Sequence, residues 1–401
     1  MADAVATYYF RPKEGITPEW AARAIAEEQT TGTWTDISTR EEYVHYLDGQ
    51  VGKITPSGDG YQVSITYPNE IFEIGNIPQY LSVFAGNLFG LSRIAAVRLL
   101  DVEFPREIIP FNGPKFGIEG VRKLVGTTDR PHVGTIIKPK VGLNPKDTAD
   151  VAYEAAIGGV DLIKDDETLT DQKFCPIAER LQRVMEKLDQ VKSETGRNVL
   201  YAVNISTAGD KILERARQAK EMGANMLMID VIVCGFDAIR VVAEEPSINL
   251  PLHIHRTMHA AITRNREHGI AMRPFCRLVR MLGGDQLHTG TVSGKMEHDM
   301  QELIGDNRTL THPWHGIKSV FPVASGGLHP GGVVDEIRVL GSDLILQAGG
   351  GIHGHPDGTR AGATAMRQAV DAAMEEIPLA TYAEDHYELK RALEKWGKVK
   401  N

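Results

Sequence analysis

The segment from Gly158 to Glu167, GGVDLIKDDE, brings a lysine and three consecutive carboxylates together at the end of an apolar run. The run has the composition of a strand that is covered on both faces. Side chains alternate along a strand, so Lys164 and Asp166 lie on one face, and Glu167 joins them if the chain turns into a loop there. Asp166 and Glu167 offer hard oxygen ligands of the kind that Mg²⁺ prefers.

The amine of Lys164 does not fit a simple magnesium site. A protonated amine cannot ligate a metal, and two neighbouring carboxylates favour the protonated form. Carbamylation by CO₂ would convert Lys164 into a third oxygen ligand. The alternative is a solvated ion-pair network at a strand end, and this segment alone leaves both interpretations open.

Further polar residues and glycines gather after other apolar runs of the chain. They are Lys138 and Lys140, then His253, His255, Arg256 and His259, then His288, then Ser325, Gly326 and Gly327, and finally Gly349, Gly350 and Gly351. Glycine-rich turns of this kind bind phosphate through backbone N–H groups, and a second phosphate could use Arg256 and His288. Taken together, these residues indicate a magnesium enzyme that acts on a small, oxygen-rich and phosphorylated substrate.

Simpler interpretations exist for each of these features. The glycines can be plain turns, Lys138 and Lys140 can be surface charges, and a single histidine at a strand end is commonly just hydrogen-bonded. The pair His253 and His255 also has the HxH spacing of zinc hydrolases. That pair follows the fifth apolar run instead of opening the series, and the hard oxygen ligands are elsewhere, which argues against zinc.

These residues require a scaffold that brings the ends of many strands together. From about residue 130, short apolar strands alternate with amphipathic helical stretches, which predicts eight βα units and therefore an α/β fold with a TIM (β/α)₈ barrel. The predicted strands are His132–Lys140, Val160–Asp166, Leu200–Ser206, Met226–Val233, Pro251–Arg256, Asp285–Thr291, Phe321–Gly327 and Leu344–Gly351. The active site of a barrel lies at the carboxyl ends of its strands, where the polar residues collect.

The rest of the chain lacks this regular alternation of strands and helices. Residues 1–125 mix strand-like and helix-like pieces and are predicted to form a separate α+β (ferredoxin-like) domain, so that residues 126–401 form the barrel. Pro378–Trp396 is predicted to add a helix or two outside the barrel.

Composition sets several classes aside. The chain has 401 residues, a net charge of −9 and no block of like charges, which argues against nucleic-acid binding through a basic face. Neither a leader-like start nor a run of 18 apolar residues is present, so we expect a cytoplasmic protein that does not enter a membrane. Cys175, Cys234 and Cys276 are widely spaced in apolar surroundings and predict neither disulfides nor a zinc site.

Several of these residues belong to longer segments in which the sequence resembles the large subunit of ribulose-1,5-bisphosphate carboxylase/oxygenase (RuBisCO). The resemblance extends along nearly the whole chain. The matching segments are TGTW (Thr31–Trp34), GNLFG (Gly86–Gly90), TIIKPK (Thr135–Lys140), GGVDLIKDDE (Gly158–Glu167), HIHRTMHA (His253–Ala260), HTGTVSGK (His288–Lys295), PVASGG (Pro322–Gly327) and QAGGG (Gln347–Gly351). The tail, with GLHPGG, GHPDG and RALEKWG, is most similar to the archaeal form III branch. The resemblance implies that ribulose 1,5-bisphosphate, CO₂ and water give two 3-phosphoglycerates through a Mg²⁺-stabilised enediol, with an O₂ side reaction.

The resemblance also implies roles for individual residues. Carbamylated Lys164 would bind Mg²⁺ with Asp166 and Glu167 and would take the C3 proton. Lys138 would reprotonate the final carbanion beside Lys140, His255 would assist hydration, and Lys295 would stabilise the new carboxylate. His259 matches a further active-site position. One phosphate would bind at Thr33, Trp34, Gly327, Gly349 and Gly350, and the other at Arg256, His288 and Ser325, beside Gly326.

The resemblance further implies an assembly. In the family, residues equivalent to Glu28, Thr33, Trp34 and Asn87 complete the site of a neighbouring subunit, so we expect a homodimer or an assembly of dimers. The form III likeness favours the absence of a small subunit and suggests salvage of nucleotide ribose.

One departure from the family pattern bears on activity. Thirty positions separate Lys295 from Ser325, fewer than the family normally has, which puts loop closure over CO₂ in doubt. The alternative is therefore a RuBisCO-like protein that enolises, isomerises or decarboxylates another sugar phosphate. A non-catalytic barrel that serves as a binding protein is a third interpretation, which the retained lysines and carboxylates disfavour.

Overall fold

The computed structural model describes residues 2–35, 37–294 and 299–397. The chain forms two compact units, which are described separately. The first comprises Met1–Asn112 and Met258–Met281, and the second comprises Gly113–Thr257 and Leu282–Asn401. None of the helices in the described ranges combines the length and the apolar character that crossing a bilayer requires.

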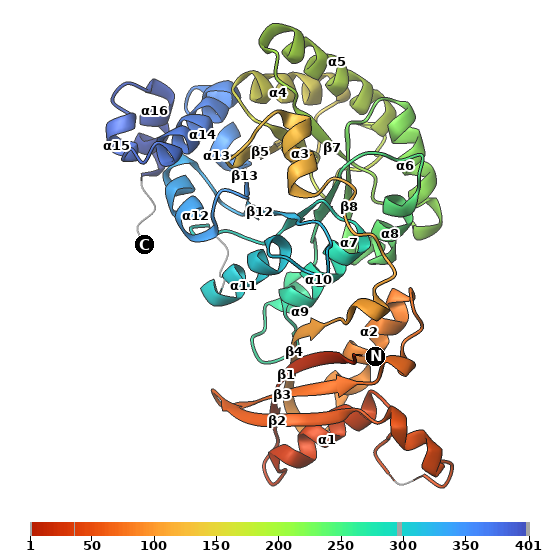
Figure 1. Cartoon of the computed structure of the whole chain (residues 1–401). Helices are drawn as coiled ribbons and strands as arrows, with labels where there is room; N and C mark the ends of the chain where they lie inside the picture. The colour runs from red at the N-terminus through yellow and green to blue at the C-terminus, as the bar shows by residue number, and fades with distance from the viewer. Residues whose placement is uncertain (1, 36, 295–298, 398–401) are drawn as a thin grey trace. The chain divides into compact units, whose positions relative to one another are not determined.

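The first unit is built on a five-stranded sheet in the order β10-β4-β1-β3-β2 (Figure 1). Its strands are β1 (Ala4–Pro12), β2 (Gln50–Ser57), β3 (Gly60–Tyr67), β4 (Ile94–Glu103) and β10 (Gly269–Ile270), and its helices include α1 (Pro18–Glu28) and α2 (Ile77–Ala85). Only the pairing of β10 with β4 is parallel. A sheet with helices packed against it confirms the predicted α+β class.

The second unit is a closed barrel of eight parallel strands, as predicted. In spatial order the strands are β11 (Gln286–His288), β12 (Phe321–Ser325), β13 (Ile345–Gln347), β5 (His132–Ile136), β6 (Leu162–Lys164), β7 (Leu200–Asn204), β8 (Met226–Asp230) and β9 (Leu252–His255). Each is shorter than the apolar run that predicted it, because the polar residues at the ends of the runs leave the ladder and form loops.

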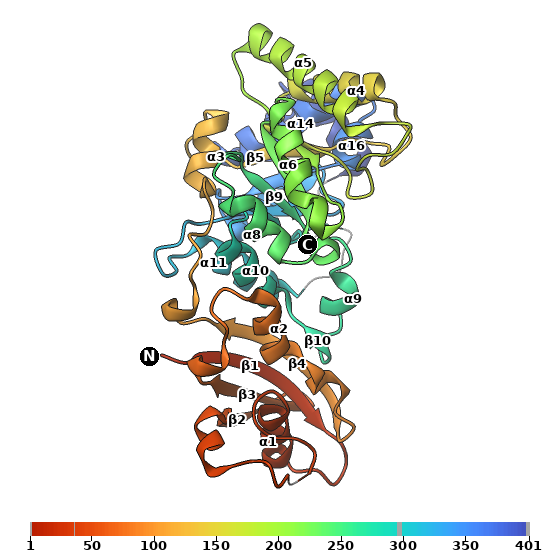
Figure 2. The same cartoon turned by 90° about the vertical axis from the view of Figure 1, so that its right-hand side faces the viewer.

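Helices follow the barrel strands and cover their outer faces (Figure 2). They are α4 (Pro145–Ile157), α5 (Ile177–Thr195), α6 (Ile212–Glu221), α7 (Val231–Cys234), α8 (Asp237–Glu244), α11 (Met300–Thr311), α12 (Val333–Leu340), α13 (Gly350–His353) and α14 (Gly358–Met374). The predicted C-terminal helices are α15 (Leu379–Tyr382) and α16 (Tyr387–Trp396), which pack against α14. Between β9 and β11, α9 (Ala260–Thr263) and most of α10 (Met272–Leu282) belong to the first unit.

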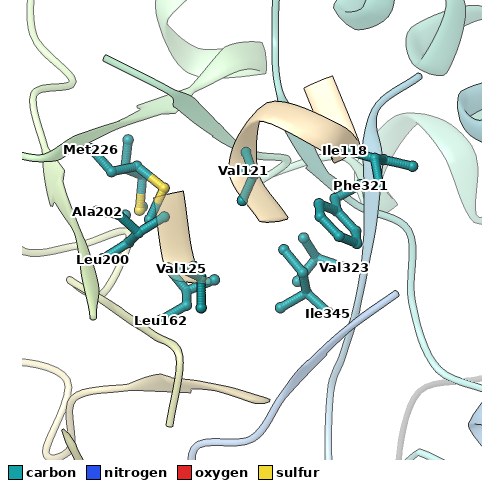
Figure 3. Packing of buried hydrophobic residues seen from close by; sticks show 11 residues of the cluster. Ile118, Val121, Val125, Leu162, Leu200, Ala202, Met226, Phe321, Val323 and Ile345 are labelled. Atoms are coloured by element: carbon teal, nitrogen blue, oxygen red, sulfur yellow. The ribbon is translucent and has the colours of Figure 1, made fainter. Parts of the chain in front are cut away.

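The amino ends of the barrel strands surround helix α3 (Gly117–Val125). Figure 3 shows Ile118, Val121 and Val125 of this helix among apolar side chains from strands on different sides of the barrel. The strand residues of this cluster are Leu162, Leu200, Ala202, Met226, Met228, Phe321, Val323 and Ile345. Helix α3 therefore closes the barrel at the amino ends of its strands with a continuous hydrophobic core.

A buried ion network joins distant parts of the chain at the same end. Asp161, just before β6, accepts hydrogen bonds from Arg130 through both carboxylate oxygens at 2.8 Å, from Arg367 at 2.5 Å and from the Val133 N–H at 2.8 Å. Burial alone would raise the pKa of Asp161, but the two arginines hold it well below its usual range. Asp161 is thus ionised and fully hydrogen-bonded.

Candidate active site

The last residue of nearly every barrel strand is polar, and these residues form one layer at the carboxyl end. They are Lys164, Asn204, Asp230, His255, His288, Ser325 and Gln347. Residues two and four positions earlier in several of the same strands belong to the hydrophobic cluster around α3, so the period of two also directs this layer into the barrel. The predicted gathering of polar groups at the strand ends is therefore present.

Lys164 is completely buried at the end of β6. Its Nζ donates to the carbonyl oxygen of Asp165 at 2.7 Å and lies 3.9 Å from a carboxylate oxygen of Glu167. Burial lowers the pKa of Lys164, although Glu167 and Asp166 act in the opposite direction. A lysine held in this way reaches its neutral, nucleophilic form more readily than an exposed lysine.

Two further lysines reach the carboxylates from the loop after β5. Lys138 Nζ lies 2.8 Å from Asp166 Oδ2, and Lys140 Nζ lies 3.0 Å from Glu167 Oε1. Burial acts to raise the pKa of Glu167, but Lys164 and Lys140 lower it on balance. Glu167 is consequently ionised at neutral pH, and the oxygen atoms of both carboxylates lie near lysine amines.

The neighbouring Asp165 points away from this cluster and anchors it. Its carboxylate accepts from Arg180 Nη2 at 3.1 Å, from the Tyr201 hydroxyl at 2.5 Å and from the Asn204 N–H at 2.9 Å. Asn204 in turn donates to the backbone carbonyls of Asp166 and Glu167, at 3.3 Å each. The carboxyl end of β6 is therefore held in place by contacts with β7 and α5, without a ligand.

The histidines predicted after β9 and β11 form a directional chain. His253 Nδ1 lies 2.6 Å from Gln286 Oε1, an acceptor, so His253 Nε2 is left to accept from His288 Nε2 at 2.8 Å. His288 Nδ1 then accepts from the Ser325 hydroxyl at 2.7 Å. Burial lowers the pKa of His253 to about 3, so the chain is neutral. It fixes the direction of the Ser325 O–H bond.

His255 lies beside this chain, with its ring centroid 4.6 Å from that of His288. Its Nδ1 is 3.1 Å from Asp230 Oδ1, and its Nε2 is 3.8 Å from Glu167 Oε2. Burial, and then the charge of Lys164, lower the pKa of His255 to about 4. The ring is a neutral imidazole at the edge of the carboxylate pair, where it can accept or pass on a proton.

The two glycine turns lie after β12 and β13, as predicted. Gly326 and Gly327 have positive φ angles of 121° and 91°, a backbone conformation that side chains disfavour. A side chain at Gly349 would meet Lys138 Cε at 3.1 Å, so this turn lies against the Lys138 stem. Beside it, Gln347 is buried, and within the described part of the chain neither of its amide atoms has a hydrogen-bond partner. An unsatisfied amide in this layer suits a polar ligand.

The remaining predicted residues are divided between the two units. Arg256 is buried just after β9 in the barrel unit, whereas His259 belongs to the first unit and contacts Thr263 Oγ1 at 2.9 Å. Lys295 lies outside the described residues, so its placement stays a prediction.

The first unit holds Glu28, Thr33, Trp34 and Asn87. Glu28, Thr33 and Trp34 line a cavity of 760 Å³, and Trp34 is 90% exposed. Asn87 is exposed at the start of a short 3₁₀ turn (Asn87–Gly90) outside this lining.

Some contributors could not be assigned from the sequence. Asn204 and Asp230 end their strands, and this position was the only signal for them, while Gln286 and Gln347 gave none. Their roles depend on cross-strand neighbours, such as Gln286 beside His253, that only the closed barrel defines.

The donor set fits Mg²⁺ bound with a carbamylated lysine. Asp166 and Glu167 are hard oxygen donors, and the buried Lys164 between them has the lowered pKa that carbamylation needs. Among the described residues no group of three or more histidine, cysteine, aspartate or glutamate side chains could hold a metal. Carbamylation of Lys164 would add a third oxygen ligand to this pair of carboxylates.

A (β/α)₈ barrel that is closed at its amino end, and that carries lysines, carboxylates and neutral histidines at its carboxyl end, has the architecture of a barrel enzyme. Two family models then cover nearly the whole chain. The N-terminal domain of the ribulose bisphosphate carboxylase large chain matches residues 1–108, and the catalytic domain matches residues 117–396. The chain belongs to the ribulose bisphosphate carboxylase large-chain family.

Individual relatives agree with this assignment. The chain is 44% identical over 398 residues to ribulose bisphosphate carboxylase of Pyrococcus furiosus, covering 99% of this chain and 94% of the relative. It superimposes on octameric Rubisco of Pyrococcus horikoshii OT3 with a TM-score of 0.94 and 42% identity, covering 100% and 95% of the two chains. Dimeric archaeal Rubisco of Hyperthermus butylicus gives a TM-score of 0.92 and 41% identity, covering 99% and 96%.

Proposed function

We propose that this protein is a ribulose-1,5-bisphosphate carboxylase, which converts ribulose 1,5-bisphosphate, CO₂ and water into two 3-phosphoglycerates and has an O₂ side reaction. The observation that carries the proposal is the buried Lys164 beside Asp166 and Glu167 in a chain of this family. The neutral amine of Lys164 loses a proton and forms an N–C bond with CO₂, which gives the carbamate.

The carbamate of Lys164, Asp166 and Glu167 would hold Mg²⁺. The bound ion would supply positive charge for the substrate oxygens on which negative charge develops. The carbamate, when present on Lys164, would also supply the base for the C3 proton.

The other polar residues of the layer handle protons. Lys138, 2.8 Å from Asp166, is positioned to return a proton to the final carbanion, and Lys140 holds Glu167 from the other side. His255, a neutral imidazole beside Asp230, accepts a proton from the water that hydrates the six-carbon intermediate.

The phosphate groups of the substrate bind at separate places in the layer. The turns at Gly326–Gly327 and Gly349–Gly350 offer backbone N–H groups to one phosphate, with Thr33 and Trp34 of a neighbouring subunit. Arg256, His288 and Ser325 would bind the other. In the chain of histidines the Ser325 hydroxyl donates to His288, so Ser325 can donate to a phosphate oxygen only when that hydrogen bond reverses.

The assembly that this requires is at least a homodimer, because Glu28, Thr33, Trp34 and Asn87 complete the neighbour's site in this proposal. The domain proposed from the sequence to carry these four residues is 1–125, with 126–401 as the catalytic barrel, whereas the compact units divide the chain after Asn112 and assign Met258–Met281 to the first unit. Archaeal relatives are dimeric or octameric. The proposal also includes, from the form III resemblance of the tail, a cytoplasmic enzyme without a small subunit that acts in nucleotide salvage.

The experiment is incorporation of labelled CO₂ into 3-phosphoglycerate, measured anaerobically after preincubation with bicarbonate and Mg²⁺. Label in 3-phosphoglycerate is the expected result. If no label appears while the C3 proton exchanges with solvent, the protein enolises without carboxylating, and the RuBisCO-like alternative replaces this proposal.

A further inference from the structure

Helix α12 carries a fully buried carboxylate, that of Glu336. Among the described residues, its oxygens accept hydrogen bonds from one short segment, which follows β11. Oε2 accepts from the Val292 N–H at 2.9 Å, and Oε1 accepts from the N–H and the hydroxyl of Ser293, both at 2.9 Å. The contacts therefore join α12, which follows β12, to the loop that follows the preceding strand.

The contacts of Glu336 suit an ionised carboxylate. Val292 and Ser293 present three donors, and a protonated carboxyl would place its own O–H among them without an acceptor. Burial raises the pKa of Glu336, and the adjacent Asp335 adds to the effect. Among the described residues, the hydrogen-bond donors to Glu336 are neutral groups.

The segment that Glu336 holds lies at a sensitive place in the proposed site. Ser293 precedes Lys295 by two positions. On its other side the segment touches the turn after β12, because a side chain at Gly294 would overlap the Gly326 carbonyl oxygen. The segment is thus fixed between α12 and a turn of the proposed phosphate site.

We propose that Glu336 is a positioning residue for the carboxylation step, because its carboxylate fixes the backbone of Val292 and Ser293 from which Lys295 extends. This inference rests on the proposed carboxylase function, in which Lys295 acts only after the C3 proton has left. Loss of the anchor therefore affects the addition of CO₂ and spares enolisation at Lys164. A residue that only stabilised the fold would affect both steps together.

The test is Glu336→Gln, in which the amide N–H₂ faces the Val292 N–H and one contact is replaced by a donor–donor clash. Two rates are measured on the same preparation: label transfer from CO₂ to 3-phosphoglycerate, and exchange of the C3 proton of ribulose 1,5-bisphosphate with solvent. We expect carboxylation to fall roughly tenfold to a hundredfold, as for a misplaced group, while exchange stays within about twofold. Equal loss of both rates, or no loss of either, overturns the inference.

Two further variants separate this role from a loss of folding. Asp335→Asn removes the adjacent carboxylate, which is paired with Arg338 at 2.6 Å on the outside of the same helix, and should leave both rates unchanged. Ser293→Ala removes one contact and keeps the buried charge, so it should lower carboxylation in the same selective way but by less. If Glu336→Gln does not fold, Ser293→Ala decides by the same criterion.

Amide hydrogen exchange tests the anchor without any reaction. The Val292 and Ser293 amides should be protected in the wild-type protein and lose protection in Glu336→Gln but not in Asp335→Asn. Unprotected wild-type amides overturn the inference. A wild-type protein that protects them but incorporates no label instead contradicts the proposed function and supports the anchor.

Discussion

The two ends of the barrel treat buried charge in opposite ways. At the amino end, Asp161 has donors for both carboxylate oxygens from Arg130, Arg367 and a backbone N–H, and α3 fills the space beside it with apolar side chains. At the carboxyl end, Lys164 is buried with one backbone carbonyl as its nearest acceptor, and the amide of Gln347 has no partner among the described residues.

The difference shows which buried charges serve stability and which serve chemistry. A network whose groups are all satisfied is rigid, and removing one member leaves an uncompensated charge. A layer with spare hydrogen-bonding capacity is costly to the free protein and becomes satisfied only when a ligand arrives. Substitutions at the two ends should therefore separate stability from activity.

The largest expected effect is that of Lys164→Met at the carboxyl end. Replacing a buried amine by an apolar side chain of similar length should leave the free energy of unfolding unchanged or raise it. Label transfer from CO₂ should fall by at least roughly a thousandfold, because the base and a metal ligand are both lost. Urea unfolding and the labelling assay measure the two effects. Measurable turnover by Lys164→Met would contradict the role given to this residue.

The second effect is on stability alone, at the amino end. Asp161→Asn leaves Arg130 and Arg367 without their buried counter-charge and should lower the free energy of unfolding by about 3–5 kcal/mol. Activity per folded molecule should be retained. Asp129→Asn, an exposed neighbour, is the matched control and should stay within about 0.5 kcal/mol. A stable Asp161→Asn protein would mean that the network is not what holds this end together.

The third effect depends on pH and also belongs to the amino end. Burial lowers the pKa of His132 to about 4, so the folded protein takes up this proton less readily than the unfolded chain. The contribution of neutral His132 to the free energy of unfolding is fully present above pH 6.5, the pKa of histidine in the unfolded chain. It is lost as the pH falls from there through the folded-state pKa of about 4, and the total loss is about 3 kcal/mol. In His132→Gln the free energy of unfolding should depend less on pH between those two values. Urea titrations at several pH values measure this dependence. An unchanged slope would assign the acid sensitivity to other groups.

The smallest effect concerns the hydrophobic cluster around α3. Val121→Ala removes two methyl groups from a fully buried position in α3 and should cost about 1–3 kcal/mol of unfolding free energy. The C3 proton exchange rate should not change, since the cluster lies at the opposite end of the strands from Lys164. A slower exchange in this variant would show that the two ends are coupled.

The barrel could be predicted because buried parallel strands appear in a sequence as continuous apolar runs, and here each run ends at polar residues. The GGVDLIKDDE segment shows this best, since Lys164 ends β6 and Asp166 and Glu167 follow directly. The strand β2 was not predicted, because QVGKITPS is mostly exposed at a sheet edge and lacks a clear apolar alternation. The two-residue strand β10 is too short to leave a pattern.

Other features depend on contacts between distant segments, which no local pattern records. Glu336 and Ser293 are 43 positions apart, and the sequence around Glu336 looks like the surface of an amphipathic helix. Likewise, nothing in Met258–Met281 indicates that it belongs with the first unit rather than with the barrel strands on either side of it. The sequence therefore predicts the elements and the chemical groups better than it predicts their partners.

The closure of the barrel between its first and last strands also constrains how the chain is made. Strand β13 pairs with β5, and the Thr135 hydroxyl donates to the Ala348 carbonyl at 2.8 Å across 213 positions. A ribosome must therefore synthesise most of the protein before β5 gains one of its two neighbours. Until then the nascent chain exposes an unpaired parallel edge, which is slow to fold and prone to associate with other chains. The order of synthesis thus leaves one edge of β5 open until the last barrel strand has been made.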